Sequence, residues 1–463
     1  MIRMRVLCLV VCLSALPQAA EPAEFYVDPV DGDMNNDGSR GKPWRSIQAV
    51  FDNGLVESQQ WAKLPYRDGA TLALKNKGAP VRAGDTIYLR SGYHGKLDIH
   101  GYYNPDVITI AAERGHTPKL ARIRIRSGAR WTLRGLHVSP EFAGSFERRT
   151  MIDLDSHGFR GPVHDVVVEQ CRAESARDSS NWTVQDWNTL ACNGMDVDGK
   201  NMTVRDCTFR NVDFGISATA VDSLIEGNTV ENFAGDGLRG LGDHTTFQYN
   251  TVKNCYDVNR NHDDGFQSWS RGADRRVGTG EVRGIVLRGN TILNFEDPGQ
   301  PHRGTLQGIG CFDGTFVDWV VENNVIITDH FHGITLSGAR DCRIVNNTVI
   351  DRRAGRPGPP WIRIGRHKNG TPSTGCVVRN NLTTALSVGD GVTADHNLIV
   401  KDPRALFVDV AAFDLRLRTG CEAIDAGSPE LAPSQDAAGT SRPQGEGIDI
   451  GAYERGAGAG ACP

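Results

Sequence analysis

A short pattern of apolar and polar positions recurs along most of the chain. In its fullest form an apolar residue is followed by two polar or small residues, an Asn, a Thr and a second apolar residue, as at 225–230 and 247–252. The first three anchors are 21 and 22 residues apart, and the later steps are 40, 34, 23 and 34. The longer steps indicate loops inserted on one side. The anchors are Cys207, Asn228, Asn250, Asn290, Asn324, Asn347 and Asn381.

A second pattern precedes each anchor and consists of a Gly followed by a large apolar residue. Side chains alternate in direction along a strand, so if the apolar residue faces a core, its polar neighbours face outward. The glycines are Gly194, Gly215, Gly237, Gly265, Gly308 and Gly333. The residues expected to face inward are Met195, Ile216, Leu238, Phe266, Ile309 and Ile334.

A repeat of about 22 residues with two or three short alternating strands predicts an all-β, single-stranded parallel β-helix. Each coil stacks on the previous one and buries its inward residues in one continuous core. An Asn at one place in each coil suits a turn, because Asn tolerates left-handed backbone and its amide can bond to the Asn above and below.

The ends of the chain complete this single domain, which we expect to span 21–455. Residues 21–60 predict an N-terminal cap, in which an amphipathic helix at 44–51 covers the open first coil. Residues 400–455 predict a closing segment, and 456–463 a flexible tail.

The first 20 residues predict a secretory signal peptide, with a basic start, an apolar stretch at 6–16 and small residues before position 21. We therefore expect a secreted or periplasmic protein. No later apolar run is long enough for a membrane span. The formal net charge of −5 argues against nucleic-acid binding. We expect a monomer with buried thiols, in which Cys421 and Cys462 are the best candidates for a disulfide.

One outer face of the predicted coils is strongly polar, and its densest part is 261–269. Two adjacent carboxylates, Asp263 and Asp264, lie one coil after Asp236 and Arg239. Carboxylates this close require a cation, an Arg or raised pKa values, so the cluster is a candidate site. Trp269 offers a flat apolar face for a sugar ring. The alternative is an Asp-rich turn in which only Asp264 faces solvent.

The coils and both ends resemble the right-handed parallel β-helix of secreted polysaccharide-active enzymes, the pectate-lyase-like superfamily. The segment 263–267, with Asp236 one coil earlier, resembles the calcium site of one class of pectate lyases. This resemblance implies Ca²⁺ held by Asp236, Asp263 and Asp264. Two departures are visible: Gln267 replaces the last expected Asp, and 308–312 carries no counterpart of the family's catalytic Lys.

A second resemblance is to polygalacturonases, which are inverting hydrolases on the same fold. Asp263 and Asp264 match their Asp pair, 331–333 matches their Gly-His-Gly, and 363–365 partly matches their Arg-Ile-Lys, with Gly365 in place of the Lys. This resemblance implies two carboxyl groups, one protonated and one ionised, about 6.5–9.5 Å apart.

The resulting hypothesis is a lyase that cleaves an acidic, uronate-containing polysaccharide by β-elimination. A glycoside hydrolase and a non-catalytic carbohydrate-binding or adhesion protein are the alternatives. The expected catalytic residues are Arg239, His262, Asp263, Asp264 and His332, and the expected substrate-binding residues are Asp196, Gln267, Trp269, Arg303, Gln307 and Arg363.

Overall fold

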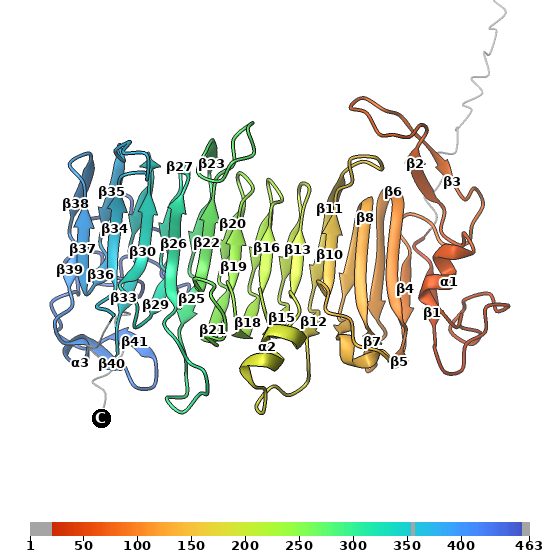
Figure 1. The fold of residues 1–463 in the computed structure, drawn as a ribbon, viewed down its shortest axis with the longest axis horizontal. Helices are drawn as coiled ribbons and strands as arrows, with labels where there is room; N and C mark the ends of the chain where they lie inside the picture. The colour runs from red at the N-terminus through yellow and green to blue at the C-terminus, as the bar shows by residue number, and fades with distance from the viewer. Residues whose placement is uncertain (1–20, 353–356, 456–463) are drawn as a thin grey trace, which may run out of the picture.

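The computed structural model describes residues 21–352 and 357–455, which wind into a long stack of coils running from the red N-terminal end to the blue C-terminal end (Figure 1). The predicted signal peptide, the predicted tail and Cys462 lie outside the described residues.

The N-terminal part contains two helices, a 3₁₀ turn and the first strands. They are β1 (Glu24–Val27), α1 (Ile47–Asp52), β2 (Ser58–Trp61), β3 (Leu72–Lys75), β4 (Thr86–Leu89), β5 (Gly92–Tyr93), β6 (Lys96–Ala112), β7 (Pro118–Leu120), β8 (Arg122–Arg134), β9 (His137–Val138), η1 (Pro140–Phe142), β10 (Ile152–Asp155), β11 (Val163–Glu169), β12 (Arg172–Glu174) and α2 (Val184–Leu190).

Regular coils of three strands follow, three of them with a short extra strand. They are built from β13 (Met195–Val197), β14 (Thr203–Arg205), β15 (Thr208–Val212), β16 (Ile216–Ala218), β17 (Leu224–Glu226), β18 (Thr229–Phe233), β19 (Leu238–Gly240), β20 (Thr246–Gln248), β21 (Thr251–Cys255), β22 (Asp264–Trp269), β23 (Glu281–Arg283), β24 (Val286–Arg288), β25 (Thr291–Leu293), β26 (Gln307–Asp313), β27 (Thr315–Val317), β28 (Val320–Glu322), β29 (Val325–Ile327), β30 (His332–Ser337), β31 (Ala339–Arg340), β32 (Arg343–Val345), β33 (Thr348–Ile350), β34 (Trp361–Gly365), β35 (Cys376–Arg379), β36 (Leu382–Thr383), β37 (Ala385–Val388), β38 (Val392–Asp395) and β39 (Leu398–Ile399). The chain then forms α3 (Pro403–Leu406), β40 (Phe407–Asp409) and β41 (Asp414–Leu417).

Strands at equal positions in successive coils pair in parallel and confirm the predicted register. Met195 pairs with Ile216, Ile216 with Leu238, and Leu238 with Phe266. All six residues expected to face inward are at most 1% exposed. They join one core cluster that extends from Val27 to Val378.

The column of glycines is explained by close packing between coils. A Cβ at Gly194, Gly215 or Gly308 would collide with the carbonyl oxygen of the corresponding Gly in the next coil. A Cβ at Gly237 or Gly265 would collide with a buried Val or Ile side chain. None of these positions has a positive φ. These glycines are therefore required by the space between coils.

The Asn anchors form a hydrogen-bonded ladder, as the repeat predicts. In the middle of it, Asn250 donates its backbone and side-chain N–H groups to Asn290 Oδ1 at 3.0 Å each, and Asn290 Nδ2 donates to the carbonyl of Phe247 at 2.9 Å. The expected left-handed backbone is displaced by one residue. It lies at the residue before each anchor, for example Tyr249 at φ 56° and Asn323 at φ 56°. The anchors instead use their amides to join the coils.

Replacing one Asn of the ladder destabilises the fold. In Asn290→Ala, the two donors of Asn250 that bond to Asn290 lose their acceptor in a buried site, and each orphaned group costs about 1–3 kcal/mol. We expect the urea midpoint to fall clearly. Asn35→Ala, at an exposed turn, is the control and changes the free energy of unfolding by less than about 0.5 kcal/mol. Equal urea midpoints for the two variants would contradict a contribution of the Asn ladder to stability.

Helix α1 packs on the first coils, although it begins later than the expected 44–51. Ser46 is its N-cap and accepts a hydrogen bond from the amide of Ala49. Trp44 is outside the helix because it bridges to Val27 and donates Nε1–H to the carbonyl of Asn36 at 2.9 Å. The buried face of the helix brings Phe51 against the ring of Trp131, 5.6 Å between centroids.

The segment after residue 400 covers one flank of the coils. Its buried residues, among them Phe407, Leu417 and Ile450, pack on Ile327 and Ile350 of β29 and β33. The strands of the last coil, β37 to β39, contain no buried residue. None of the helices in the described part of the chain reaches the length and hydropathy that crossing a bilayer requires.

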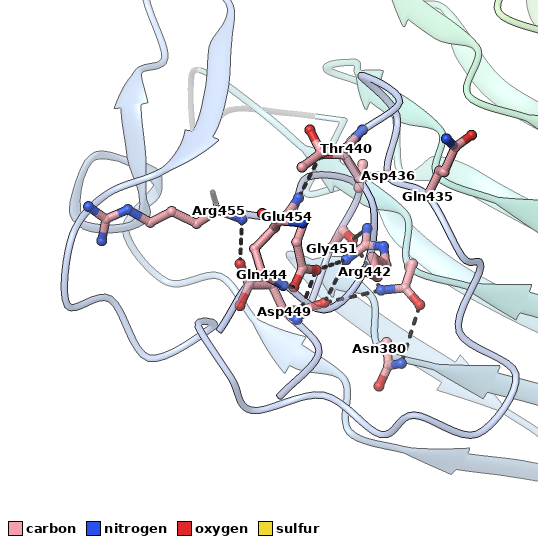
Figure 2. Close-up of polar contacts among 12 residues, drawn as sticks. Asn380, Gln435, Asp436, Thr440, Arg442, Gln444, Asp449, Gly451, Glu454 and Arg455 are labelled. Atoms are coloured by element: carbon pink, nitrogen blue, oxygen red, sulfur yellow. Dashed lines mark hydrogen bonds and ion pairs between the residues drawn. The ribbon is translucent and has the colours of Figure 1, made fainter. Parts of the chain in front are cut away.

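A buried ionic network fastens this segment to the coils (Figure 2). Arg442 donates Nη1–H to Glu454 at 2.5 Å and Nη2–H to the carbonyl of Gly451 at 2.9 Å. The side chains of Arg442 and Glu454 are 0% and 1% exposed. Asp436 accepts the backbone N–H of Glu454 at 2.8 Å, and Asp449 that of Arg455 at 2.7 Å.

Candidate functional site

At the start of the first strand of each coil, two side chains three residues apart point away from the core, toward the outer face. The two intervening residues, a Gly and a buried apolar residue, face the core, so the flanking residues meet outside. Arg239 donates Nε–H to Asp236 at 2.5 Å, and Gln267 donates Nε2–H to Asp264 at 2.8 Å. Arg239 pairs in register with Gln267, so the two pairs occupy equal positions in successive coils.

The carboxylates of this cluster are deeply buried. Asp264 is 0% exposed, Asp236 2% and Asp263 6%. Asp236 Oδ1 accepts the backbone N–H of Asp264 at 3.1 Å, which ties the two coils together. Cys255 donates its thiol to Asp263 at 3.4 Å. Within the described residues, Oδ1 of Asp263 and Oδ1 of Asp264 have no hydrogen-bond partner.

Gly310 in the following coil makes room for Asp264. Its strand position pairs with Gln267, and a Cβ there would collide with Asp264 Oδ1. Gln307 pairs in register with Asp264 and donates its backbone N–H to the carbonyl of Asp263 at 2.9 Å. Gln307 therefore lies in the next coil directly beside the Asp263–Asp264 pair.

Two aromatic rings enclose the guanidinium of Arg239. Its Cζ lies 3.8 Å from the ring centroid of Phe214 and 5.4 Å from that of Trp269. Its side chain is 23% exposed, and its two Nη atoms make no hydrogen bond within the described part of the chain. The arrangement presents Nη donors to solvent between two flat apolar faces.

Burial raises the pKa values of all three carboxyl groups. Desolvation is the main cause for each; it raises the pKa of Asp236 to about 6 despite the opposing charge of Arg239, and that of Asp263 to about 8. The pKa of Asp264 is raised well above its usual range by desolvation and then by Asp236. Burial therefore favours the neutral form of Asp263 and Asp264 more strongly than that of Asp236.

These shifts predict a pH dependence of stability. The pKa of Asp263 is about 8 in the folded chain and 3.8 in a free side chain, so unfolding releases a proton between these values. Its contribution to stability is complete below about pH 4 and is lost as the pH rises through about 8. We expect the urea midpoint of the unaltered protein to fall between pH 5 and pH 9, and to fall less in Asp263→Asn. An equal fall of the urea midpoint in both proteins would show that ionisation of Asp263 does not lower stability.

A second group of rings lies farther along the same face, around His332. Its Nδ1 lies 2.8 Å from Thr335 Oγ1, and Trp361 donates Nε1–H to Thr335 at 3.1 Å. Desolvation lowers the pKa of His332 and of His330 to about 4, so both rings are neutral at pH 7. The coil that contains Gly310 separates this group from Asp264, and Phe312 of that coil contacts His332 with ring centroids 4.7 Å apart.

The other predicted residues lie around these two groups. Asp196 lies two coils before Arg239 on the same face and accepts a hydrogen bond from Thr150 at 2.7 Å. Arg363 pairs in register with Thr335. The charge of His262 helps to lower the pKa of His330. Arg303, on a loop, lies over the ring of Phe295 and makes no described contact with the carboxylates.

Some residues at this face were not predicted from the sequence. Arg148 donates Nη2–H to Asp213 at 2.6 Å, and the loop that carries it therefore extends over the outer face. Arg148 lies in a loop outside the repeat, so no sequence pattern indicated its contact with Asp213. Phe214 occupied an outward position next to Arg239 in the repeat, so its contact with the guanidinium was open to prediction.

The carboxylates are a poor match for the calcium site that the resemblance implies. Both oxygens of Asp236 are engaged, by Arg239 and by the amide of Asp264. Within residues 21–352 and 357–455, no group of three or more His, Cys, Asp or Glu side chains is arranged to hold a metal ion. No chemical step below depends on a metal.

Comparison with known proteins agrees with the coils described above. Residues 193–408 match the family described as "Right handed beta helix region". The chain is a right-handed β-helix. This confirms the predicted fold class, including its hand. No curated protein matches the sequence of this β-helix.

Solved structures resemble this β-helix at low sequence identity. XylC in complex with xylose has a TM-score of 0.56 and 9% identity, over 94% of this chain and 99% of that chain. Pectate lyase Pel9A has a TM-score of 0.48 and 14% identity, over 94% and 97%. A GH136 lacto-N-biosidase from Eubacterium ramulus has a TM-score of 0.41 and 13% identity, over 81% and 67%. At 9% identity, the likeness to XylC shows a shared fold alone.

Proposed function

We propose that the protein is a secreted enzyme that cleaves a uronate-containing polysaccharide by β-elimination on the outer face around Asp264. The observation that carries the proposal is the fully buried Asp264, whose pKa burial raises, in the same cluster as the ring-enclosed Arg239. Proton donors and oriented cations at one face are what cleavage of an acidic glycan requires.

Each step of the proposed elimination is assigned to one side chain of the site. The free Nη donors of Arg239 pair with the uronate carboxylate, which makes the C5 proton more acidic. The ring of His262, which is exposed next to Asp263, accepts that proton. The bond between C4 and the glycosidic oxygen breaks as the C4–C5 double bond forms, and Asp264 gives its proton to the departing oxygen. Trp269 and Phe214 provide apolar faces for the sugar rings.

A glycoside hydrolase is the second candidate, because burial raises the pKa of Asp264 well above its usual range, whereas that of the adjoining Asp236 rises only to about 6. Such a pair can supply a general acid and a general base. Gln267 holds Asp264 in place by its hydrogen bond. In this case a water molecule attacks the sugar, and no double bond forms.

Incubation with acidic and neutral polysaccharides separates these functions. Ultraviolet absorbance from an unsaturated uronate supports the lyase, and new reducing ends without that absorbance support the hydrolase. Binding with neither product overturns both and indicates a carbohydrate-binding or adhesion protein. Loss of activity in EDTA, restored by Ca²⁺, would establish the calcium site, and unchanged activity would reject it. Mass spectrometry of exported protein tests the proposed signal peptide, whose removal leaves Glu21 at the N-terminus.

A further inference from the structure

A pocket lies at a different corner of the coils from Asp264. It has a volume of about 410 Å³ and is bounded by the ends of β20, β24 and β28, by Arg343 of β32, and by residues 431–435. The five-residue strand β21 separates the turn that carries Tyr249 from the candidate site, a path of about 16 Å. The two sites are therefore distinct.

Tyr249 provides a flat surface in this pocket. It is 41% exposed, although it occupies a turn with φ 56°. One edge of its ring packs against Gly289 in the next coil, where a Cβ would lie 2.7 Å from ring atoms Cδ1 and Cε1. The glycine lets the ring lie against the backbone, which fixes it as a platform for an apolar sugar face.

Arg343 supplies a positive charge that makes no ion pair with any carboxylate of the described residues. At the same strand position, the coils before and after it carry Val320 and Val377. Its Nε is buried without a partner, and the described residues give its guanidinium no ion pair. The other two charged groups of the pocket, Arg288 and Glu322, pair with each other at 2.6 Å.

The wall formed by 431–435 is held rigidly. Asn323 donates Nδ2–H to the carbonyl of Gln435 at 2.7 Å and accepts from Arg442 at 3.3 Å. Arg442 is the centre of the buried network in Figure 2, where Gln435 lies at its edge. The pocket is therefore built from two fixed walls, one from the coils and one from the C-terminal segment.

We propose that this pocket binds a short acidic segment of a polysaccharide, with the carboxylate of one sugar residue on Arg343 and the ring face of another on Tyr249. A guanidinium without an ion pair at one end of the pocket and an aromatic platform at the other can recognise a charged group and an apolar surface of the same chain. The pocket extends over four coils, about 14 Å, so it accommodates part of a chain. It would hold an acidic glycan away from the site of cleavage.

Calorimetric titration with a galacturonate trisaccharide tests this proposal. The protein carries Asp264→Asn so that no sugar is consumed. We expect two sites per chain. Arg343→Gln removes the site in this pocket, and Arg239→Gln removes the site on the outer face. In Tyr249→Ala, binding in this pocket is at least tenfold weaker. If the proposed function fails and the outer face binds nothing, one site is found and Arg343→Gln removes it.

Three results would overturn the inference. One is unchanged stoichiometry in Arg343→Gln, and another is equal binding of maltotriose, a neutral trisaccharide. The third is displacement of the sugar by inorganic sulfate at equal concentration, which would mean a site for charge alone. Arg45→Gln, an exposed Arg on the N-terminal cap, is the matched control and leaves both sites intact. Unchanged thermal midpoints show that each variant is folded.

Discussion

Asp264→Asn lowers polysaccharide cleavage by about 10²- to 10⁴-fold, the range expected for loss of a general acid. The Asn keeps the size of the side chain and can still accept the hydrogen bond from Gln267 Nε2. It has no proton to give to the departing glycosidic oxygen. The loss should appear in kcat, measured with saturating substrate by the release of product.

The same change does not weaken the fold. Burial raises the pKa of Asp264, so ionising it costs stability as the pH rises, and Asn cannot ionise. We expect the urea midpoint at pH 8 to be equal or higher in the variant. Asp222→Asn, in an exposed pair with Lys200, is the matched control and leaves kcat unchanged. Activity of Asp264→Asn within twofold of the unaltered protein would place the chemistry elsewhere.

Arg442→Met lowers the free energy of unfolding by about 3–5 kcal/mol, the usual effect of breaking a buried ion pair. Glu454 is left buried without its partner, and the carbonyl of Gly451 loses a donor. Urea denaturation measures the loss. Proteolysis should cut the segment after residue 400 first, because the network fastens this segment to the coils.

Two further variants test this explanation. Lys96→Met, which breaks an exposed pair with Glu147, changes the free energy of unfolding by about 0–1 kcal/mol. Arg442→Met combined with Glu454→Leu should recover much of the loss, because no uncompensated charge is then buried. A double variant as unstable as Arg442→Met would show that geometry at Arg442, and not the orphaned charge, dominates.

Repetition made the coils predictable. Because equal positions in successive coils must stack, spacing alone located the inward residues, the Gly column and the Asn ladder. The same reasoning placed Asp236 and Arg239 beside the Asp263–Asp264 pair. It misplaced the left-handed residue by one position. Two adjacent residues share the work: the Asn joins the coils through its amide, and the residue before it adopts the left-handed backbone of the turn.

Non-repetitive contacts were beyond this reasoning. Arg148 reaches Asp213 from a loop, and no periodicity reports where a loop folds. His332 was grouped with Asp264 on polarity, whereas the intervening coil with Gly310 separates them. The burial that raises the pKa values of the carboxyl groups also depends on neighbouring coils in three dimensions, so their protonation states required the structure.

The Asn ladder also bears on how this architecture can change. Each rung connects only to the coil on either side, and the long insertions leave from other corners without interrupting it. Loops beside the outer face can thus be lengthened, shortened or exchanged while every rung keeps its partners. The sequence of these loops and the integrity of the scaffold are therefore under separate control, and an engineered loop exchange should alter the outer face without loss of stability.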